Sequence, residues 1–352
     1  MPDAANKRDV VLVIHGMGTH AQDDTRKFIN DGINLAAKRF GFEKFNFEKE
    51  VELIEFNYSK FLDEVRNKDA NYAETMSKHL SFLAGHGLAA NIISELTEFF
   101  ADFDEDKALY THWMDVLYYG ETFWGEKIRV DLAVKLNELL KSANLKAQSV
   151  HIIAHSLGTA VLHDTLAEVY DPDSAVRNKV PNLDPNLFFV DSLFQVANVS
   201  RMVHLLSEVD DPLTSIVHPH ADGCSKVMYN VHNTFDPFTW LLPYNRPLDR
   251  GGDTEVKTVR VVNTHDIQEY MEAPPVAKSI LNTVLSKKVS KENYDKAVSE
   301  HGKTSVTTSF AELQKAFKDI KNSATASGKI EALKVFFRTA KDFKDLAEKI
   351  LK

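Results

Sequence analysis

The chain has little cysteine and no long apolar run. Its single cysteine, Cys224, excludes an internal disulfide and favours a reducing compartment. No stretch approaches the roughly 18 consecutive apolar residues that a membrane span needs. The N-terminal sequence MPDAANKRDVVLVIHGMG also lacks the ordered basic, apolar and small-residue regions of a secretory signal. We therefore expect a cytoplasmic protein.

Sequence motifs for cofactor and metal chemistry are also missing. The glycine-containing loop at residues 15–18 has neither the G-x-G-x-x-G pattern nor the Gly-Lys-Ser/Thr pattern of a phosphate-binding loop. The chain has no H-E-x-x-H motif, and one cysteine cannot make a zinc cluster. We therefore expect neither a cofactor nor a metal site.

What the chain does contain is the composition of a large globular protein with an uneven charge. Hydrophobic residues make up 43% of the 352 residues and charged residues 26%, enough to bury a sizeable core. Residues 286–352 hold 15 Lys and Arg against 9 Asp and Glu, a net charge of +6. Because the whole chain has a net charge of −9, residues 1–285 have a net charge of −15. An acidic body argues against nucleic acid as a partner. The basic tail leaves room for an anionic surface or a docking partner.

Apolar runs that alternate with helical patterns predict the fold class. Helical spacing is clear at residues 25–40, 126–143 and 157–170. The β-branched run Val10–Ile14 is typical of a strand buried on both faces of a parallel sheet. We predict an α/β protein with a mostly parallel sheet flanked by helices. The six predicted strands are Val10–Ile14, Val51–Phe56, Val150–Ala154, Leu187–Val190, Val227–Val231 and Val256–Val262.

Two segments depart from this alternation. Residues 60–118 have helical spacing and no strand, and they are interrupted by Gly85 and Gly87. They form either a cap with glycine hinges or a helical pair that completes the core. From residue 286 the pattern is helical throughout, with a capping box at Ser309–Glu312. We predict a main domain over residues 1–285 and a helical extension over 286–352. The extension packs on the body, mediates self-association or contacts a membrane peripherally.

Ser156 lies where an apolar run meets a helical pattern, in the sequence VHIIAHSLGTAVLHDTL. A serine hydroxyl is a weak nucleophile and needs a base and a site for the oxyanion. A sharp turn from strand to helix projects the hydroxyl clear of the sheet and requires small residues two before and two after the serine. Ala154 and Gly158 occupy those positions. We interpret Ser156 as a nucleophile, the alternative being a small packing residue or helix cap.

The loop in VVLVIHGMGTH predicts the oxyanion site. Gly16 and Gly18 allow its backbone to approach a substrate closely. We assign one oxyanion donor to the amide of Met17 and the other to the amide of Leu157, the residue after the nucleophile. His15, Gly16, Gly18 and His155 are expected to line the substrate site, with His15 bracing the loop.

The remaining catalytic candidates must follow in the order acid, then histidine. Asp236 comes just past the fifth predicted strand and His265 just past the sixth, where loops gather at the carboxyl edge of a parallel sheet. His265 would accept the proton of Ser156, and Asp236 would fix its tautomer. Asp191, placed at the end of the fourth predicted strand, is the alternative acid. His232 is expected to line the site.

These stretches together resemble the α/β-hydrolase superfamily. Within it, MDVLYYGETFWGEKIRVDLAVKLNELL looks like the Asp-Val-x-x-Tyr stretch and following helix of the DDHD-domain phospholipases and lipases. AHSLGTAVLHDTL is similar to that family's GHSLGS turn, including Asp164 in the helix, and YNVHNTFDPF to its segment with the catalytic acid. Ala154 replaces the first glycine, Phe-Thr-Trp follows Asp236-Pro237 in place of Val-Ala-Tyr, and the family's late Asp-Tyr signature has no counterpart. The resemblance implies cleavage of phospholipid acyl esters.

The leading expectation is therefore a serine hydrolase of carboxylic esters, with lipid acyl esters as the substrate class and an acyl-enzyme intermediate. A second hypothesis keeps the same residues and changes the substrate to small esters, thioesters or peptides. A third is a hydrolase-fold protein that acts as a binding or regulatory module without catalysis. The third would be expected to lack a member of the triad, and this sequence lacks none.

Overall fold

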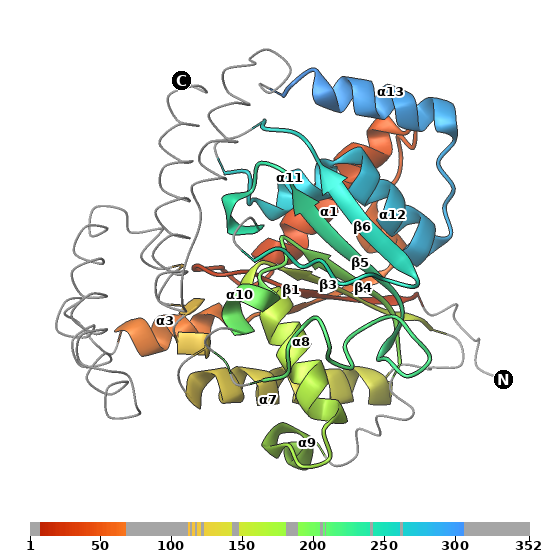
Figure 1. The fold of residues 1–352 in the computed structure, drawn as a ribbon. Helices are drawn as coiled ribbons and strands as arrows, with labels where there is room; N and C mark the ends of the chain where they lie inside the picture. The colour runs from red at the N-terminus through yellow and green to blue at the C-terminus, as the bar shows by residue number, and fades with distance from the viewer. Residues whose placement is uncertain are drawn as a thin grey trace.

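A computed structural model describes residues 8–67, 112, 115–116, 118–120, 123–142, 148–180, 189–204, 207, 209–239, 242–260 and 263–305. Its centre is one six-stranded sheet in the order β2-β1-β3-β4-β5-β6, in which every neighbouring pair is parallel (Figure 1). The strands are β1 (Val10–Ile14), β2 (Glu52–Phe56), β3 (Val150–His155), β4 (Val190–Val196), β5 (Ser225–Asn233) and β6 (Gly251–Val256).

Helices cover both faces of the sheet, so the predicted α/β class is confirmed. On one face lie α3 (Ser59–Asn67), α7 (Phe123–Ser142), α8 (Leu157–Tyr170), α9 (Ala175–Lys179) and α10 (Ser200–His204). On the other lie α1 (Asp24–Arg39), α2 (Phe47–Glu50), α11 (Ile267–Glu272), α12 (Pro274–Leu285) and α13 (Lys291–Gly302).

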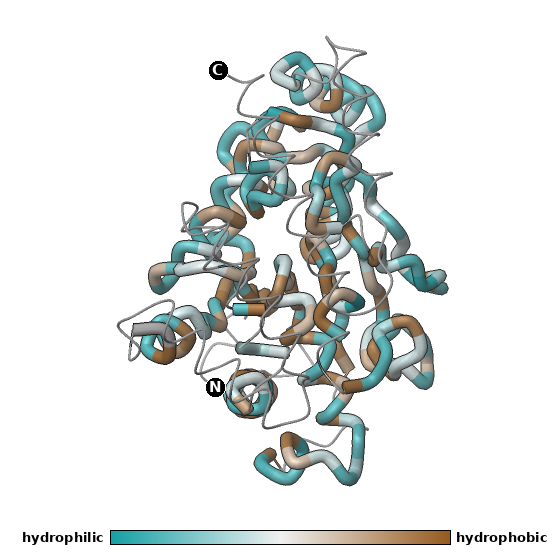
Figure 2. The backbone as a smooth tube through the Cα atoms, turned by 60° about the vertical axis from the view of Figure 1, so that its left-hand side comes forward, coloured by the Kyte–Doolittle hydropathy of each residue, from teal (hydrophilic) through white to brown (hydrophobic). Residues whose placement is uncertain are grey.

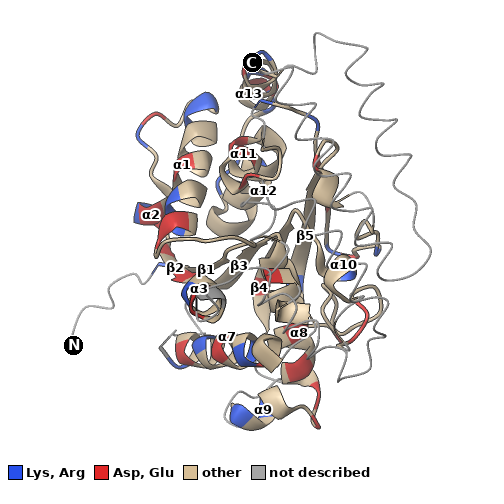
Figure 3. Cartoon of the chain, turned by 90° about the vertical axis from the view of Figure 1, so that its left-hand side faces the viewer, with Lys and Arg blue, Asp and Glu red and all other residues tan. Residues whose placement is uncertain are grey.

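The central strands are buried because their residues are apolar on both faces. All five residues of β1 are buried. Leu12 and Ile14 pack in the core shared with α7 and α8, while Val11 and Val13 pack in the core shared with α1 and α12. Hydrophobic stretches of the chain accordingly gather toward the interior (Figure 2), and the Lys, Arg, Asp and Glu residues lie mainly on the helices and loops around the sheet (Figure 3). Removing this apolar surface from water stabilises the fold by roughly 25 cal/mol per Å².

Two predicted strands were placed wrongly. The fourth runs from Val190 to Val196 instead of Leu187–Val190 because polar residues, including Ser192 and Gln195, interrupt its apolar pattern yet are buried. The sixth was predicted at Val256–Val262 but runs over Gly251–Val256. Strand β6 is at the edge of the sheet and has exposed positions, so its sequence GGDTEV carries little apolar signal.

Parts of the predicted insertion and extension lie outside the described residues. Within 60–118 the structure describes most of α3 and a few residues from 112 onward, but not Gly85 or Gly87. Within 286–352 it describes α13, but not the capping box at Ser309–Glu312. No helix in the described part of the chain has both the length and the apolarity to cross a bilayer.

The strand order places several chain segments at one edge of the sheet. The chain first goes outward from β1 to β2, and then returns to the other side of β1 to form β3. Such a reversal in a parallel sheet leaves a crevice at the carboxyl ends of the strands, where ligands bind. His15 directly follows β1, Ser156 directly follows β3, and Asp236 is the third residue after β5.

Candidate active site

Ser156, His265 and Asp236 form a continuous hydrogen-bonded row at the carboxyl edge of the sheet. The Nε2 atom of His265 lies 2.7 Å from the hydroxyl oxygen of Ser156. Its Nδ1 atom lies 2.7 Å from Oδ2 of Asp236. Because a carboxylate only accepts, Nδ1 carries a proton in this arrangement and Nε2 is left to accept one from the serine. The row joins residues separated by 109 and 29 positions in the sequence.

The backbone of Ser156 adopts a conformation that is rare for a residue with a side chain. Its φ is 53° and its ψ is −126°, while α8 begins at the next residue. The turn is held by the Ser156 amide, which donates to the carbonyl of Val196, and by the hydroxyl of Thr159, which donates to the carbonyl of Ser156. A strained conformation of this kind costs about 1–3 kcal/mol and persists only where surrounding contacts fix it.

The turn depends on close approaches that only small residues permit. A Cβ atom on Gly158 would lie 2.4 Å from the carbonyl oxygen of His15, so the start of α8 lies too close to the end of β1 for any residue but glycine. Ala154, two residues before the serine, is fully buried in the core shared with α8. Its methyl group is therefore accommodated where the resembling motif has glycine.

Asp236 is oriented by two further hydrogen bonds besides that of His265. The hydroxyl of Tyr270 donates to the same oxygen, Oδ2, at 2.7 Å, and the amide of Phe238 donates to Oδ1 at 3.0 Å. Burial, followed by the nearby Asp236 charge, raises the pKa of Tyr270 well above its usual value, so this hydroxyl remains a donor. Since Asp236 is fully buried, these donors replace the water that a carboxylate otherwise requires.

His265 is held by a second set of contacts. Nε2 of His155 lies 2.8 Å from the carbonyl oxygen of His265. Burial lowers the pKa of His155 well below its usual value, so its ring is neutral and donates this hydrogen bond. The ring of Phe238 packs 4.3 Å from the His265 ring, measured between centroids. His155 therefore acts here on the backbone of His265.

The loop after β1 lies directly against Ser156. A Cβ atom on Gly16 would be 3.3 Å from the serine hydroxyl oxygen. No described residue accepts a hydrogen bond from the amide of Met17 or of Leu157. Both amides therefore have the free donor that an oxyanion site needs.

His15 braces this loop. Its Nε2 accepts hydrogen bonds from the amides of Tyr58 and Ser59, at 2.9 and 3.1 Å, and its Nδ1 donates to the carbonyl of Gly16 at 2.6 Å. Burial, the largest cause, and the neighbouring His20 together lower the pKa of His15 to about 3. A neutral, fully buried ring whose two nitrogens are both hydrogen-bonded holds the backbone of this loop in place.

Gly18 and Asp115 fix the far end of the same loop. The amide of Gly18 donates to Oδ2 of Asp115 at 2.7 Å, and Gly18 has a φ of 97°. Asp115 is the aspartate of the Asp-Val-x-x-Tyr stretch, and it is 1% exposed. The segment that leads into α7 therefore helps to set the backbone beside Met17.

A methyl group at position 16 is expected to disrupt the site. In Gly16→Ala the added Cβ would lie 2.7 Å from Cβ of Ser156 and 3.0 Å from Nδ1 of His155, so the loop and the serine must separate. We expect kcat/KM for an ester to fall by about 10²-fold, because small displacements of reacting groups have effects of this size. Gly302→Ala, where an added Cβ meets nothing within 4 Å, is the control. Near-normal hydrolysis by Gly16→Ala would contradict the placement of this loop.

The alternative acid, Asp191, is at the wrong end of the sheet. The sequence predicts Asp191 at the end of the fourth strand, but it is the second residue of β4. Its carboxylate accepts a hydrogen bond from the amide of Val150 and forms an ion pair with Lys226. Asp191 therefore links the amino-terminal ends of three strands and lies away from Ser156.

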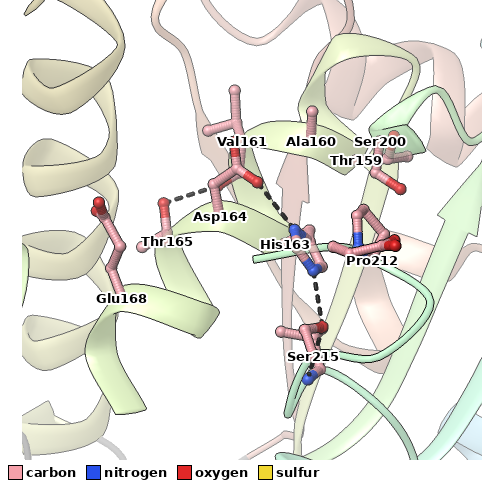
Figure 4. Close-up of polar contacts among 12 residues, drawn as sticks. Thr159, Ala160, Val161, His163, Asp164, Thr165, Glu168, Ser200, Pro212 and Ser215 are labelled. Atoms are coloured by element: carbon pink, nitrogen blue, oxygen red, sulfur yellow. Dashed lines mark hydrogen bonds and ion pairs between the residues drawn. The ribbon is translucent and has the colours of Figure 1, made fainter. Parts of the chain in front are cut away.

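A second contact of serine, histidine and aspartate joins α8 to the segment around Ser215 (Figure 4). Nδ1 of His163 lies 2.8 Å from Oδ1 of Asp164, and its Nε2 lies 2.8 Å from the hydroxyl oxygen of Ser215. Oδ2 of Asp164 accepts from the hydroxyl of Tyr119 at 2.9 Å. Ser215 follows no strand and does not have the positive φ of Ser156. This buried row ties the segment around Ser215 to α8 and lacks the turn that presents a nucleophile.

Sequence reasoning missed two residues that shape the site. Tyr270 lies one turn into α11, five residues after His265, and nothing in its local pattern distinguishes it from a packing residue. Asp115 was noted only as part of a resemblance. His232, expected to line the site, lines a cavity beside β5.

The described residues include no group of three His, Cys, Asp or Glu side chains arranged to hold a metal ion. No protein-family model matches the chain, and no curated protein is significantly similar to it. The site is therefore interpreted from its own geometry.

Proposed function

We propose that the chain is a serine hydrolase of the α/β-hydrolase superfamily that cleaves carboxylic esters. The observation that carries this proposal is the row from Ser156 through His265 to Asp236, with 2.7 Å between each pair of polar atoms. The positive φ of Ser156 at the start of α8 supports it, because such a strained turn between strand and helix is typical of the nucleophile in these enzymes.

In the proposed reaction His265 removes the hydroxyl proton of Ser156 as the oxygen attacks the ester carbonyl carbon. The amides of Met17 and Leu157 stabilise the negative charge that develops on the carbonyl oxygen. When the tetrahedral intermediate collapses, His265 gives its proton to the departing alcohol and an acyl-serine remains. Water, deprotonated by the same histidine, then attacks the acyl carbonyl carbon. The bond to the serine oxygen breaks, His265 returns its proton to that oxygen, and the carboxylic acid leaves.

The substrate class is proposed from the resemblance to lipases and phospholipases, which suggests lipid acyl esters. Ser156 is fully buried and His265 is 7% exposed, so both reacting groups are shielded from bulk water. The same shielding would strengthen the electrostatic contacts inside the site, since they are not weakened by water.

A fluorophosphonate probe tests the proposal, because it phosphonylates a serine activated by a neighbouring base. We expect the folded protein to be labelled at one residue, and peptide mass mapping to place the label on Ser156. Heat-denatured protein is the control and should remain unlabelled. A label on Ser215, or no label under conditions that modify a known serine esterase, would reject the proposed nucleophile.

A further inference from the structure

The carboxyl end of β2 lies beside the loop that follows β1. The two strands are parallel and pair Ile14 with Phe56, so two residues further along each chain Gly16 comes opposite Tyr58. Tyr58 is 3% exposed, and its ring stacks on the ring of His15 with 3.9 Å between the centroids. The strand register therefore brings a buried phenol against the backbone of the loop.

The hydroxyl of Tyr58 contacts two consecutive carbonyl groups of this loop. It lies 3.0 Å from the carbonyl oxygen of His15 and 3.1 Å from that of Gly16. Both oxygens only accept, so the hydroxyl is the donor, and burial keeps it protonated by raising the pKa of Tyr58 well above its usual value. Nδ1 of His15 is a second donor to the Gly16 carbonyl, at 2.6 Å.

Holding the carbonyl of Gly16 also orients the amide of Met17, because both groups belong to one planar peptide. The peptide bonds of the described residues are trans, and in a trans peptide the C=O and the N–H point in opposite directions. The N–H of Met17 therefore points away from Tyr58, and no described residue accepts a hydrogen bond from it. The Cα atom of Gly16, where this peptide begins, lies against Ser156.

The peptide between Met17 and Gly18 is held at both of its polar groups. Its N–H donates to Oδ2 of Asp115 at 2.7 Å, and its carbonyl accepts from Nε2 of His20 at 3.2 Å. Of the four polar groups in the two peptides that flank Met17, only the Met17 N–H has no partner in the described part of the chain. A donor that is oriented before the reaction needs no reorganisation when charge develops beside it.

We propose that Tyr58 is a positioning residue for the oxyanion site. Its hydroxyl orients the peptide between Gly16 and Met17 so that the Met17 amide meets the carbonyl oxygen of the substrate in the transition state, and His20 holds the next peptide in the same way. Tyr58 acts through the Gly16 carbonyl and takes no part in the proton transfers. This inference rests on the function proposed above and adds residues to it.

Tyr58→Phe tests the proposal, because it keeps the ring against His15 and removes only the hydroxyl. We expect kcat for p-nitrophenyl butyrate to fall about tenfold with little change in KM, since an oxyanion contact forms only in the transition state. The loss should stay below the roughly 10²- to 10³-fold that follows removal of an oxyanion donor, because Nδ1 of His15 still holds the Gly16 carbonyl.

A sulfur-containing substrate provides a readout that a purely structural role would not change. The matched thionoester has C=S in place of C=O, and sulfur is a weak hydrogen-bond acceptor, so the Met17 amide stabilises its transition state much less. We expect Tyr58→Phe to lower the ratio of kcat/KM for the ester to kcat/KM for the thionoester by about fivefold to tenfold. Loss of folded molecules would lower both rates equally and leave the ratio unchanged.

Tyr119→Phe is the matched control. It removes another fully buried tyrosine hydroxyl, one that donates to Oδ2 of Asp164 at 2.9 Å and not to the loop. We expect this variant to melt at a lower temperature than the wild type and to keep the wild-type ratio. An unchanged ratio in Tyr58→Phe, or an equal fall in Tyr119→Phe, would overturn the proposal.

His20→Ala provides a second test, from a half-buried position where substitution is better tolerated. It removes the donor to the Met17 carbonyl, so we expect the ratio to fall by about twofold to fivefold. If Tyr58→Phe did not fold, an unchanged ratio in His20→Ala would overturn the proposal. Failure of fluorophosphonate labelling would reject the hydrolase itself, whereas normal labelling of Ser156 with an unchanged ratio in Tyr58→Phe would reject only the role of Tyr58.

Discussion

Ser156→Ala is expected to lower kcat for an activated ester by about 10⁴- to 10⁶-fold, the range seen when the serine nucleophile of a catalytic triad is removed. The alanine keeps the size that the turn tolerates, and removes only the oxygen that lies 2.7 Å from Nε2 of His265. Initial rates with a p-nitrophenyl ester measure the loss, and circular dichroism establishes that the variant is folded.

The chain provides a matched control in Ser215→Ala. Ser215 is also buried and also hydrogen-bonded to a histidine that contacts an aspartate, so the two substitutions remove chemically equivalent groups. We expect Ser215→Ala to lose stability and to keep its rate per folded molecule. Hydrolysis that survives in Ser156→Ala but disappears in Ser215→Ala would assign the proposed chemistry to Ser215, His163 and Asp164 instead.

The fold class could be predicted because its signal is local. The run Val10–Ile14 and the pattern at residues 157–170 each determine an element from their own residues, and helix α8 begins and ends where the pattern does. Strands β4 and β6 were misplaced because their burial is decided by neighbours. Ser192 is buried since β4 lies between β3 and β5, which no alternation within VDSLFQV reveals.

In the candidate site too, some residues could be predicted from local sequence and others could not. Ser156 and Asp236 each follow a predicted strand, so their sequence positions alone suggest roles. The contact of Asp236 with Tyr270 joins residues 34 positions apart, and that of Gly18 with Asp115 joins residues 97 positions apart. Tertiary contacts of this kind produce no periodic pattern in the sequence, so they could not be predicted from it. They determine how rigidly the reacting groups are held.

Asp191 illustrates why the direction of a strand matters. An aspartate next to an apolar run satisfies the chemical requirement for an acid at either end of the strand. In a parallel sheet, however, only the carboxyl ends meet at the ligand-binding edge. Because the predicted strand ended too early, Asp191 was placed at this edge, whereas it is the second residue of β4.

Asp236→Asn is expected to reduce kcat by about 10⁴-fold while the structure is preserved. An asparagine at this position can present its NH₂ group to His265, which then turns the Nδ1 atom into an acceptor and puts the proton on Nε2. That tautomer cannot take the proton of Ser156. The reduction is measured with the same ester across a range of pH, and the unfolding free energy of the variant is measured by urea titration.

Tyr270→Phe separates the charge of Asp236 from its positioning. This substitution removes the hydroxyl that donates to Oδ2 at 2.7 Å but leaves the carboxylate and its contact with His265. We expect kcat to fall only about twofold to tenfold, as for the loss of one hydrogen bond to a group that keeps its other donors. If Asp236→Asn reduced kcat no more than Tyr270→Phe does, the carboxylate would only hold the loop in place. Other groups would then have to orient His265, such as the His155 ring that contacts its backbone carbonyl.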